Sequence, residues 1–513
     1  MLYPIGIQNF ADLRNKGFVY VDKTAHVHKL ATTGKYYFLS RPRRFGKSLL
    51  ISTMEAYFSG KRELFRGLAM ENLERDWTPH PILHLDLNTE NYLEPGSLAR
   101  VLDYALRGWE EIYGAEPVDT SLSLRFLGVV RRAFEKTGTQ VVILVDEYDK
   151  PMLQAIGDAE LQEEYRAVLK AFYSVLKTQD RYIHFAFLTG VTKFGKVSVF
   201  SDLNNLNDIS MDSQYADICG VSETELDAYF GDSVGELATA TGMNFAETRA
   251  ELKNQYDGYH FENKTPGIYN PFSLLNTFNK LKFRDYWFET GTPSFLVKLL
   301  QQSDYDLTKL QQEEVSSDVL NSINSMSRNP IPVIYQSGYL TIKGYDEEFR
   351  TYRLGFPNKE VETGFIKYLV PFYTPATENN TEFFVANFVK DVRKGDPESF
   401  LSRMQTFFDD SDYRVAGKLE KYFQNAMYLI FKMMGFYTEA ERATSRGRID
   451  VVLKTPDFIY VIEIKLDGSA DDALAQIEEK GYARAFSQDP RKLYKIGVNF
   501  SSATRGIDSW KII

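Results

Sequence analysis

The stretch YYFLSRPRRFGKSLLIS, from Tyr36 to Ser52, decides how the first part of this chain folds. Its first residues belong to an apolar and aromatic run, Lys35 to Ser40, that is typical of a strand. Its last residues begin an apolar pattern with helical spacing, which Gly60 ends. Between the two stands the tripeptide Gly46-Lys47-Ser48. A strand, a tight loop and a helix are the setting of a phosphate-binding loop, so this tripeptide is a candidate nucleotide site.

The residues of this loop have distinct expected roles. Lys47 would reach the β- and γ-phosphate oxygens of a nucleotide, and the hydroxyl of Ser48 would join a Mg2+ shell. The usual signature has a glycine five residues before the tripeptide, where this chain has Arg41. We expect Arg41, Arg43 or Arg44 to contact phosphates or to act across a subunit boundary. The alternative is a solvated basic loop.

A second motif lies in VVILVDEYDK, Val141 to Lys150, which is a continuous apolar strand that ends in two carboxylates. In this arrangement, known as Walker B, Asp146 would hold Mg2+ and Glu147 would polarise the attacking water. The alternative is that these acids only cap the next helix. A later strand, within His184 to Gly195, ends at Thr189, which is either a γ-phosphate sensor or a turn threonine. The alternation of strands and helices predicts a doubly wound parallel sheet that binds its ligand at the carboxyl ends of the strands.

Five blocks of the sequence resemble the AAA-ATPase-like family of microbial P-loop proteins. They are PIGIQNF, VYVDKT, YYFLSRPRRFGKSLL, VDEYDKP and LTGVTKFGKVSVFSDLNNLNDIS. The resemblance implies an ATPase domain, expected at residues 1–215, with ATP as its ligand. In that family the loop usually reads R-P-R-R-F-G-K-S, so Arg41 does not indicate a decayed site. Members often carry a C-terminal PD-(D/E)XK nuclease-like domain.

Residues 216–375 are expected to form a helical lid and a winged-helix-like region, and the lid is implied by the same resemblance. Ser222 and Glu225 have capping-box spacing at the start of a helix. The stretch Ile334 to Val361 predicts a hairpin around the turn KGYDEE. Winged helices often bind nucleic acid, but an acidic tip argues against insertion beside phosphates, so a scaffold or oligomerisation role fits better. The next domain boundary is expected in Thr374 to Glu382, and Lys394 to Ser399 is a second candidate.

The stretch SRGRIDVVLKTPDFIYVIEIKLDG, Ser445 to Gly468, predicts a second hairpin, with the turn KTPD. Asp450 lies on its first strand, whereas Glu463 and Lys465 lie two residues apart, and so on one face, of the second. Asp450 and Glu463 would supply hard oxygen ligands for Mg2+ or Mn2+, and Lys465 would orient or help to deprotonate a water molecule. The alternative is an ordinary exposed charged face, although the setting is unusually apolar.

This segment resembles the PD-(D/E)XK nuclease superfamily. The resemblance implies three accessory residues, Glu420 on the preceding helix and Gln476 and Lys480 in a Q-x-x-x-K-x-Y pattern on the following one. Arg446 and Arg448, beside the site, suit phosphate contacts unless they are only solvated. The nuclease-like α/β domain is expected at residues 376–513.

The bulk properties of the 513 residues limit the alternatives. A net charge of -10 excludes a generally basic nucleic-acid coat, and a single cysteine excludes an intramolecular disulfide. No apolar run approaches the roughly 18 residues that span a bilayer, and the N-terminus lacks a signal core, so a cytoplasmic protein without membrane contact is expected.

Taken together, the sequence predicts an α/β multidomain protein with an ATPase core, a helical and winged-helix-like middle and a nuclease fold. The expected function is ATP binding and hydrolysis coupled to Mg2+-dependent cleavage of nucleic acid, with DNA as the favoured partner. A homo-oligomer is expected if an arginine acts in trans. The alternative function is a signalling ATPase whose nuclease-like domain serves only to bind nucleic acid or a protein partner. A second alternative is an interaction protein in which nucleotide is a structural ligand.

Overall fold

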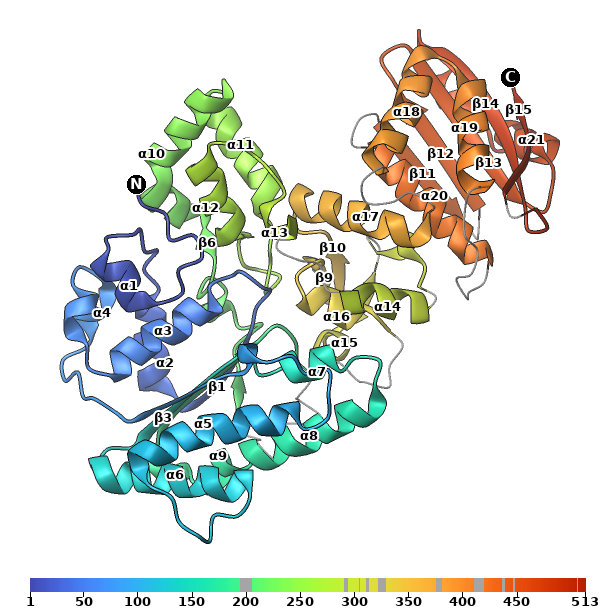
Figure 1. Cartoon of the computed structure of the whole chain (residues 1–513). Coiled ribbons are helices and arrows are strands. Elements are labelled where there is room, and N and C mark those ends of the chain that lie inside the picture. Colours follow the sequence, from blue (N-terminus) through green and yellow to red (C-terminus); the bar gives the residue numbers. More distant parts are fainter. Residues whose placement is uncertain are drawn as a thin grey trace. The chain divides into compact units, whose positions relative to one another are not determined.

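The computed structural model describes residues 1–193, 205–289, 294–303, 305–310, 313–321, 329–374, 381–409, 419–435, 439–445, 448–504 and 506–513. The chain divides into two compact units (Figure 1). The first unit comprises Met1–Leu299 and Gln311–Val361, and the second comprises Leu300–Leu310 and Glu362–Ile513. The first unit contains both the expected ATPase domain and most of the expected middle region. The expected division into three domains, at residues 215 and 375, therefore stays a prediction.

The first unit is built on a five-stranded sheet of order β2-β3-β4-β1-β5, and every pairing in it is parallel. The strands are β1 (Tyr36–Ser40), β2 (Ile82–Asp86), β3 (Val141–Asp146), β4 (Ile183–Gly190) and β5 (Asn207–Asp208). The predicted parallel sheet is therefore confirmed. The chain order reverses beside β1, and such a point opens a crevice at the carboxyl ends of the strands.

Helices cover both faces of this sheet (Figure 1). The strands β1 and β3 are buried along their whole length, which explains their unbroken apolar sequences. One face packs against α5 (Ser97–Tyr113), α6 (Leu122–Thr137) and α8 (Ala159–Tyr173) in a single hydrophobic core. On the other face lies α3 (Lys47–Phe58), whose Phe58 ring packs 5.0 Å from the ring of Phe185 on β4. The layered arrangement fixes the start of α3 at the carboxyl edge of the sheet.

The rest of the first unit contains a helical cluster and a small antiparallel sheet. A capping box at Ser222 and Glu225 starts α10 (Glu223–Thr241), as the sequence predicts. This helix shares a core with α11 (Phe245–Tyr256) and α12 (Pro271–Lys280). The predicted hairpin is confirmed as β9 (Thr341–Asp346) paired with β10 (Thr351–Gly355), and β8 (Glu314–Ser316) completes a three-stranded sheet. The predicted position of its turn is wrong, because the first four residues of KGYDEE belong to β9 and the turn lies at 347–350.

Shorter elements connect these parts of the first unit. The helices are α1 (Phe10–Asn15), α2 (Thr24–Thr33), α4 (Ala69–Leu73), α7 (Lys150–Gln154), α9 (Val175–Thr178), α13 (Tyr286–Glu289), α15 (Ser317–Asn321) and α16 (Ile331–Gln336). A two-stranded pair joins β6 (Val221–Ser222) to β7 (Ile268–Tyr269). The helices α14 (Ser294–Gln302) and α17 (Lys359–Tyr373) each continue from the first unit into the second.

The second unit is a mixed five-stranded sheet of order β11-β12-β13-β14-β15, in which only β13 and β14 run parallel. Its strands are β11 (Glu439–Ser445), β12 (Arg448–Lys454), β13 (Phe458–Leu466), β14 (Lys492–Ser501) and β15 (Gly506–Ile512). Its helices are α18 (Thr381–Lys394), α19 (Pro397–Asp409), α20 (Leu419–Gly435) and α21 (Ala470–Lys480). The predicted hairpin is present as β12 and β13, with Asp450 directly opposite Glu463 in the register.

A glycine brings α21 close to the sheet of the second unit. A Cβ atom at Gly497 on β14 would lie 2.2 Å from the carbonyl oxygen of Ala470, at the start of that helix. Gly497 is the register partner of Glu463. The missing side chain therefore allows α21 to pack over the strand that carries Glu463.

A buried carboxylate lies near the end of the first unit. Glu360, on the first turn of α17, is fully buried and accepts hydrogen bonds from the Ser273 hydroxyl at 2.8 Å and from the Trp287 backbone N–H at 2.7 Å. Burial, with a further contribution from the charges of Asp285 and Glu289, raises the pKa of Glu360 to about 8. This side chain is therefore largely protonated at neutral pH.

The raised pKa of Glu360 predicts how stability depends on pH. Between its ordinary value of 4.5 and about 8, the folded chain holds a proton that the unfolded chain has lost, so stability falls as pH rises. The loss is at most about 1.4 kcal/mol per pH unit. Glu360→Gln, which keeps the neutral shape, should flatten the fall in Tm between pH 6 and pH 8, whereas Glu348→Gln on an exposed turn should not. An unchanged slope in Glu360→Gln would show that Glu360 is ionised in the fold.

Candidate functional site

The loop between β1 and α3 has the backbone of an anion site. Arg44 has a φ of 64° and Gly46 a φ of 97°, and the helix begins at the next residue, Lys47. The first intrahelical bond runs from the Leu50 N–H to the Gly46 carbonyl at 3.0 Å, so the preceding amides of the first turn have no acceptor within the helix. Apart from Gly46 and its two chain neighbours, no heavy atom of the described residues lies within 4 Å of the position that a Gly46 Cβ would take. These amides can therefore receive an anion at the helix N-terminus.

The ammonium of Lys47 is folded back onto this loop. The side chain is buried, and Nζ donates hydrogen bonds to the carbonyls of Arg41 at 3.1 Å and Pro42 at 3.2 Å. It also lies 3.1 Å from Oε1 of Glu147, on the turn after β3. The contact joins the two predicted motifs, which are about 100 residues apart in the sequence, in one cluster.

The carboxyl ends of β3 and β4 bring the other predicted residues together. Asp146 ends β3, and its Oδ1 accepts a hydrogen bond of 2.6 Å from the hydroxyl of Thr189 on β4. Glu147 has a φ of 52°, a left-handed conformation that is uncommon for a glutamate and that turns the chain sharply after the strand. Because of this turn, the two adjacent carboxylates have different partners. Asp146 contacts Thr189, and Glu147 contacts Lys47.

Asp149 is a residue of this region that the sequence analysis did not single out. It is fully buried, and it accepts hydrogen bonds from the backbone N–H groups of Val191 and Thr192 and from the Thr192 hydroxyl. Burial, followed by the nearby charge of Glu147, raises the pKa of Asp149 to about 7. Asp149 thus ties the turn after β3 to the end of β4. The only signal in the sequence is its place in the block VDEYDKP.

A cavity of about 810 Å³ lies against the phosphate loop, wholly within the first unit. Its lining includes Lys47, Ser48, Glu147 and Lys150, and the N-terminal segment Pro4 to Gln8. A smaller, mainly apolar cavity of about 100 Å³ shares Gly46 and Leu49 with it. A cavity lined by charged side chains and a mainly apolar cavity thus adjoin each other at the start of α3.

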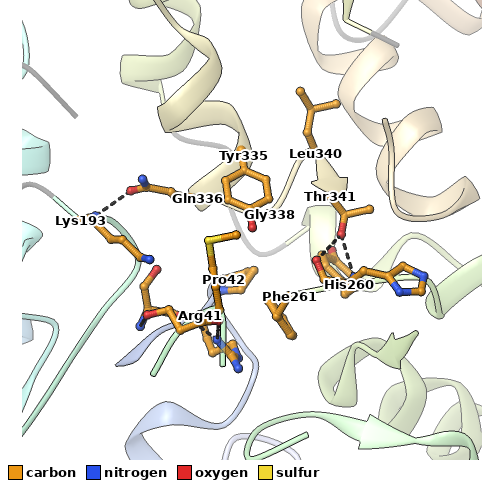
Figure 2. A pocket seen from close by; sticks show the side chains of 14 residues that line it. Arg41, Pro42, Lys193, His260, Phe261, Tyr335, Gln336, Gly338, Leu340 and Thr341 are labelled. Carbon is orange, nitrogen blue, oxygen red and sulfur yellow. Dashed lines mark hydrogen bonds between the residues drawn. The ribbon is translucent and has the colours of Figure 1, made fainter. Parts of the chain in front are cut away.

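Arg41 lies on the other side of the loop, in a small pocket that Figure 2 shows from close by. Its guanidinium is fully buried and donates to the carbonyls of Ser40 at 2.9 Å, Ser210 at 2.8 Å and Tyr215 at 2.9 Å. It also stacks 3.9 Å from the centre of the Phe261 ring. These contacts use both terminal nitrogens, while the buried Nε has no hydrogen-bond partner among the described residues. Since three loop and chain carbonyls already hold the guanidinium, the geometry favours a structural role for Arg41 over the predicted phosphate contact.

The two other arginines of the loop are placed differently. Both line the large cavity. Arg43 is half-buried and donates to the Tyr339 hydroxyl at 3.3 Å, and its carbonyl accepts from the Trp287 indole at 3.0 Å. Arg44 is exposed, and its guanidinium lies 5.0 Å from the centre of the Phe272 ring. These two side chains, rather than Arg41, are in a position to meet a ligand in that cavity.

A second candidate site lies on β13 in the second unit. Glu463 is fully buried, and neither of its carboxylate oxygens accepts a hydrogen bond from the described residues. The Nζ of Lys465 lies 3.7 Å from Oε1 of Glu463 and donates to Oε1 of Gln476 on α21. An unsatisfied buried carboxylate is costly, so this arrangement suits a cation that is bound in function.

The remaining predicted residues of this site are known only in part. The backbones of Asp450 and Arg448 lie on β12 and that of Glu420 lies on α20, whereas their side chains lie outside what the structure describes. Arg446 lies wholly outside the described residues. Lys480 is exposed at the end of α21, and its Nζ lies 5.9 Å from the centre of the Tyr482 ring.

Metal binding at either site would need several kinds of donor. Within the described ranges, no three His, Cys, Asp or Glu side chains form a group that could hold a metal ion. Asp146 and Glu463 could therefore take part in a metal site only with other oxygen ligands, such as the Ser48 hydroxyl, water, phosphate or an acid outside those ranges. In the part of the chain that is described, no helix is long and apolar enough to cross a membrane.

Comparisons with known proteins agree with this division of the chain. Residues 4–200 match the family described as predicted AAA-ATPase, and residues 418–510 match the PD-(D/E)XK nuclease superfamily. A protein from Azotobacter chroococcum mcd 1, described as an uncharacterized protein in the vnfD 5' region, is 35% identical over 518 residues. That alignment covers 98% of this chain and 97% of the relative, so the similarity includes both units.

The contrast between two loop arginines gives a test of their roles. Arg41→Gln should lower the free energy of unfolding by about 3 kcal/mol or more, because three buried carbonyls lose a charged donor. Arg44→Gln, at an exposed position, should change it by no more than about 0.5 kcal/mol. Urea unfolding followed by tryptophan fluorescence measures both. A stable Arg41→Gln variant with weakened phosphate binding would instead support the phosphate contact predicted from the sequence.

Proposed function

The chain belongs to the predicted AAA-ATPase family and carries a C-terminal domain of the PD-(D/E)XK nuclease superfamily, and from this we propose that it hydrolyses ATP and cleaves nucleic acid under nucleotide control. The observation that carries the ATPase part is the contact of Lys47 with both the phosphate loop and Glu147. DNA is the substrate that we favour, and the identity of the metal ion belongs to the same proposal.

In the proposed nucleotide site, the phosphates occupy the charged cavity beside the N-terminus of α3. Lys47 exchanges its contacts with two carbonyls and Glu147 for phosphate oxygens, which leaves the Glu147 carboxylate free to orient and polarise water. Ser48 and Asp146 would hold a divalent cation, which supplies positive charge to the phosphates when bound. Thr189, hydrogen-bonded to Asp146, is suited to respond to the terminal phosphate.

The smaller apolar cavity is the proposed site of the base. It is lined by side chains from the N-terminal segment, from α3 and from the helical cluster, including Pro4, Leu49, Phe230 and Pro271. Cys219, the only cysteine of the chain, also lines it and is buried. A flat aromatic base buries its faces well in such surroundings, and the shared Gly46 places this cavity next to the phosphates.

In the proposed nuclease site, Glu463 is the central carboxylate. Its two unsatisfied oxygens, together with Asp450 opposite it in the register, would hold a divalent cation that activates water when bound. Gln476 holds the Lys465 ammonium at that carboxylate, where it can orient water or steady negative charge on the phosphate. Arg446 and Arg448 are the proposed contacts with the nucleic-acid backbone.

The phosphate-loop assignment predicts a loss of nucleotide binding in Lys47→Ala. Wild-type protein should unfold at a higher temperature in the presence of ATP and Mg2+, because ligand bound only to the folded state stabilises it. Lys47→Ala should abolish this increase in Tm, whereas Lys61→Ala, on the surface beyond α3, should keep it. An equal increase in the Lys47→Ala variant would contradict the assignment.

The nuclease assignment predicts a selective effect of Glu463→Gln. Cleavage of supercoiled plasmid and of linear single strands with Mg2+ or Mn2+ should require ATP, and the variant should reduce it roughly 100-fold or more while ATP turnover persists. Glu478→Gln, which removes an exposed carboxylate of the same domain, is the matched control.

The outcomes of that experiment separate the proposal from its alternatives. Cleavage in the wild type that Glu463→Gln retains would show that another site carries it. ATP turnover without cleavage under either metal would favour the signalling ATPase with a nuclease fold that only binds. Nucleotide binding without turnover, unaffected by Glu147→Gln, would favour a structural nucleotide.

A further inference from the structure

Lys150 stands out among the cations around the large cavity. It is the first residue of α7 and follows the Asp146–Asp149 turn, with its backbone N–H bonded to the Glu147 carbonyl at 3.1 Å. Its Nζ donates to two oxygens of one residue, the carbonyl of Asn88 at 2.8 Å and the side-chain Oδ1 of Asn88 at 2.9 Å. Asn88 follows β2, the strand next to β3 in the sheet.

The cavity places Lys150 among the proposed nucleotide-binding residues. Lys47, Ser48 and Glu147 line the same space, as do the polar side chains of Asn91 and Gln154. Burial lowers the pKa of Lys150, while the charges of Asp86 and Glu147 act against this effect. The Glu147 carboxylate, which pairs with Lys47, is thus also close enough to affect Lys150 electrostatically.

The charge of Lys150 is not neutralised in the way that the charge of Lys47 is. Among the described residues, no carboxylate oxygen lies within 4.0 Å of its Nζ, which contacts only the neutral oxygens of Asn88. An ammonium has three donor hydrogens, so two bonds to Asn88 leave one for a ligand. A half-buried cation at the edge of a large cavity is suited to an anionic group.

We propose that Lys150 is a catalytic residue that contacts the terminal phosphate of a nucleoside triphosphate and stabilises the charge that develops during hydrolysis. This inference rests on the proposed ATPase function. In the reaction, the oxygen of a water molecule forms a bond to the γ-phosphorus, and the bond from that phosphorus to the bridging oxygen breaks. The nucleoside diphosphate leaves with the electron pair, and a proton of the water passes to Glu147 or to the phosphate product.

Lys150 would supply the positive charge that an arginine, from the same chain or from a partner protein, supplies in other nucleotide hydrolases. Asn88 would hold the ammonium in place through its carbonyl and its side chain, so that little reorganisation is needed when the triphosphate arrives. The alternative is a purely structural role, in which the hydrogen bonds from Lys150 to Asn88 only hold α7 against the end of β2. This alternative makes a different prediction. Loss of a structural contact should lower the stability of the fold and weaken the binding of ATP and ADP equally.

The test compares Lys150→Gln and Lys150→Arg with a matched control in the same unit. Lys35, at the amino end of β1, donates likewise to the carbonyl and the side-chain Oδ1 of one residue, Asp180. Each variant of the full chain is assayed for kcat with ATP and for Kd with ADP and with the β,γ-imido analogue of ATP.

Lys150→Gln should lower kcat roughly 100-fold, because it removes one preorganised donor to the developing charge. It should change the Kd for ADP by no more than about twofold, since ADP lacks the phosphate that Lys150 contacts. Lys150→Arg, which keeps the charge, should retain turnover within about tenfold of wild type. Lys35→Gln should keep wild-type kcat and Kd values.

Four results would overturn the proposal. Turnover by Lys150→Gln within about twofold of wild type would remove the catalytic role. A parallel loss of ADP binding would show a structural tie. The wild type could bind nucleotide without turnover, and the binding constants then decide. An equal increase of the Kd for ADP and for the imido analogue in Lys150→Gln would refute the contact with the terminal phosphate. An increase of the Kd for the imido analogue alone would support it. Failure of the wild type to bind any nucleotide would refute the proposed function itself, and this inference with it.

Discussion

The buried ammonium of Lys47 is the contact on which the nucleotide half depends. A buried cation must find acceptors, and here two loop carbonyls and one carboxylate provide them. The carbonyls fix the path of the phosphate loop, and the carboxylate fixes the left-handed turn at Glu147. The same acceptors can be exchanged for phosphate oxygens. The contacts of the Lys47 ammonium therefore hold the site together without a ligand. A bound nucleotide has to replace them with its phosphate oxygens.

The two candidate sites solve the problem of buried charge in different ways. At the phosphate loop, Lys47 and Glu147 neutralise each other. On β13, the Lys465 ammonium is held partly by Gln476, and the Glu463 oxygens remain without hydrogen bonds from the described residues. The close approach at Gly497 places α21 where Gln476 can reach that ammonium. The first site is thus closed by an ion pair, whereas the second retains capacity for a cation.

The sequence was sufficient to predict what depends on local pattern. Apolar runs ending in polar residues predicted β1, β3 and β4, and the spacing around KTPD predicted that Asp450 and Glu463 lie on paired strands. The role of Arg41 could not be predicted, because its partners Ser210, Tyr215 and Phe261 lie far along the chain. Nor could that of Lys150, since nothing in the sequence shows that β2 brings Asn88 beside it.

The burial of Cys219 has a practical consequence. It is the only thiol in the chain, and it lies in the wall of the apolar cavity rather than on the surface. Cysteines introduced at exposed positions would therefore react with maleimide dyes ahead of it, and no native cysteine need be removed first. Pairs of dyes, one on each unit, could then report the distance between the two halves of the protein as nucleotide and nucleic acid are added.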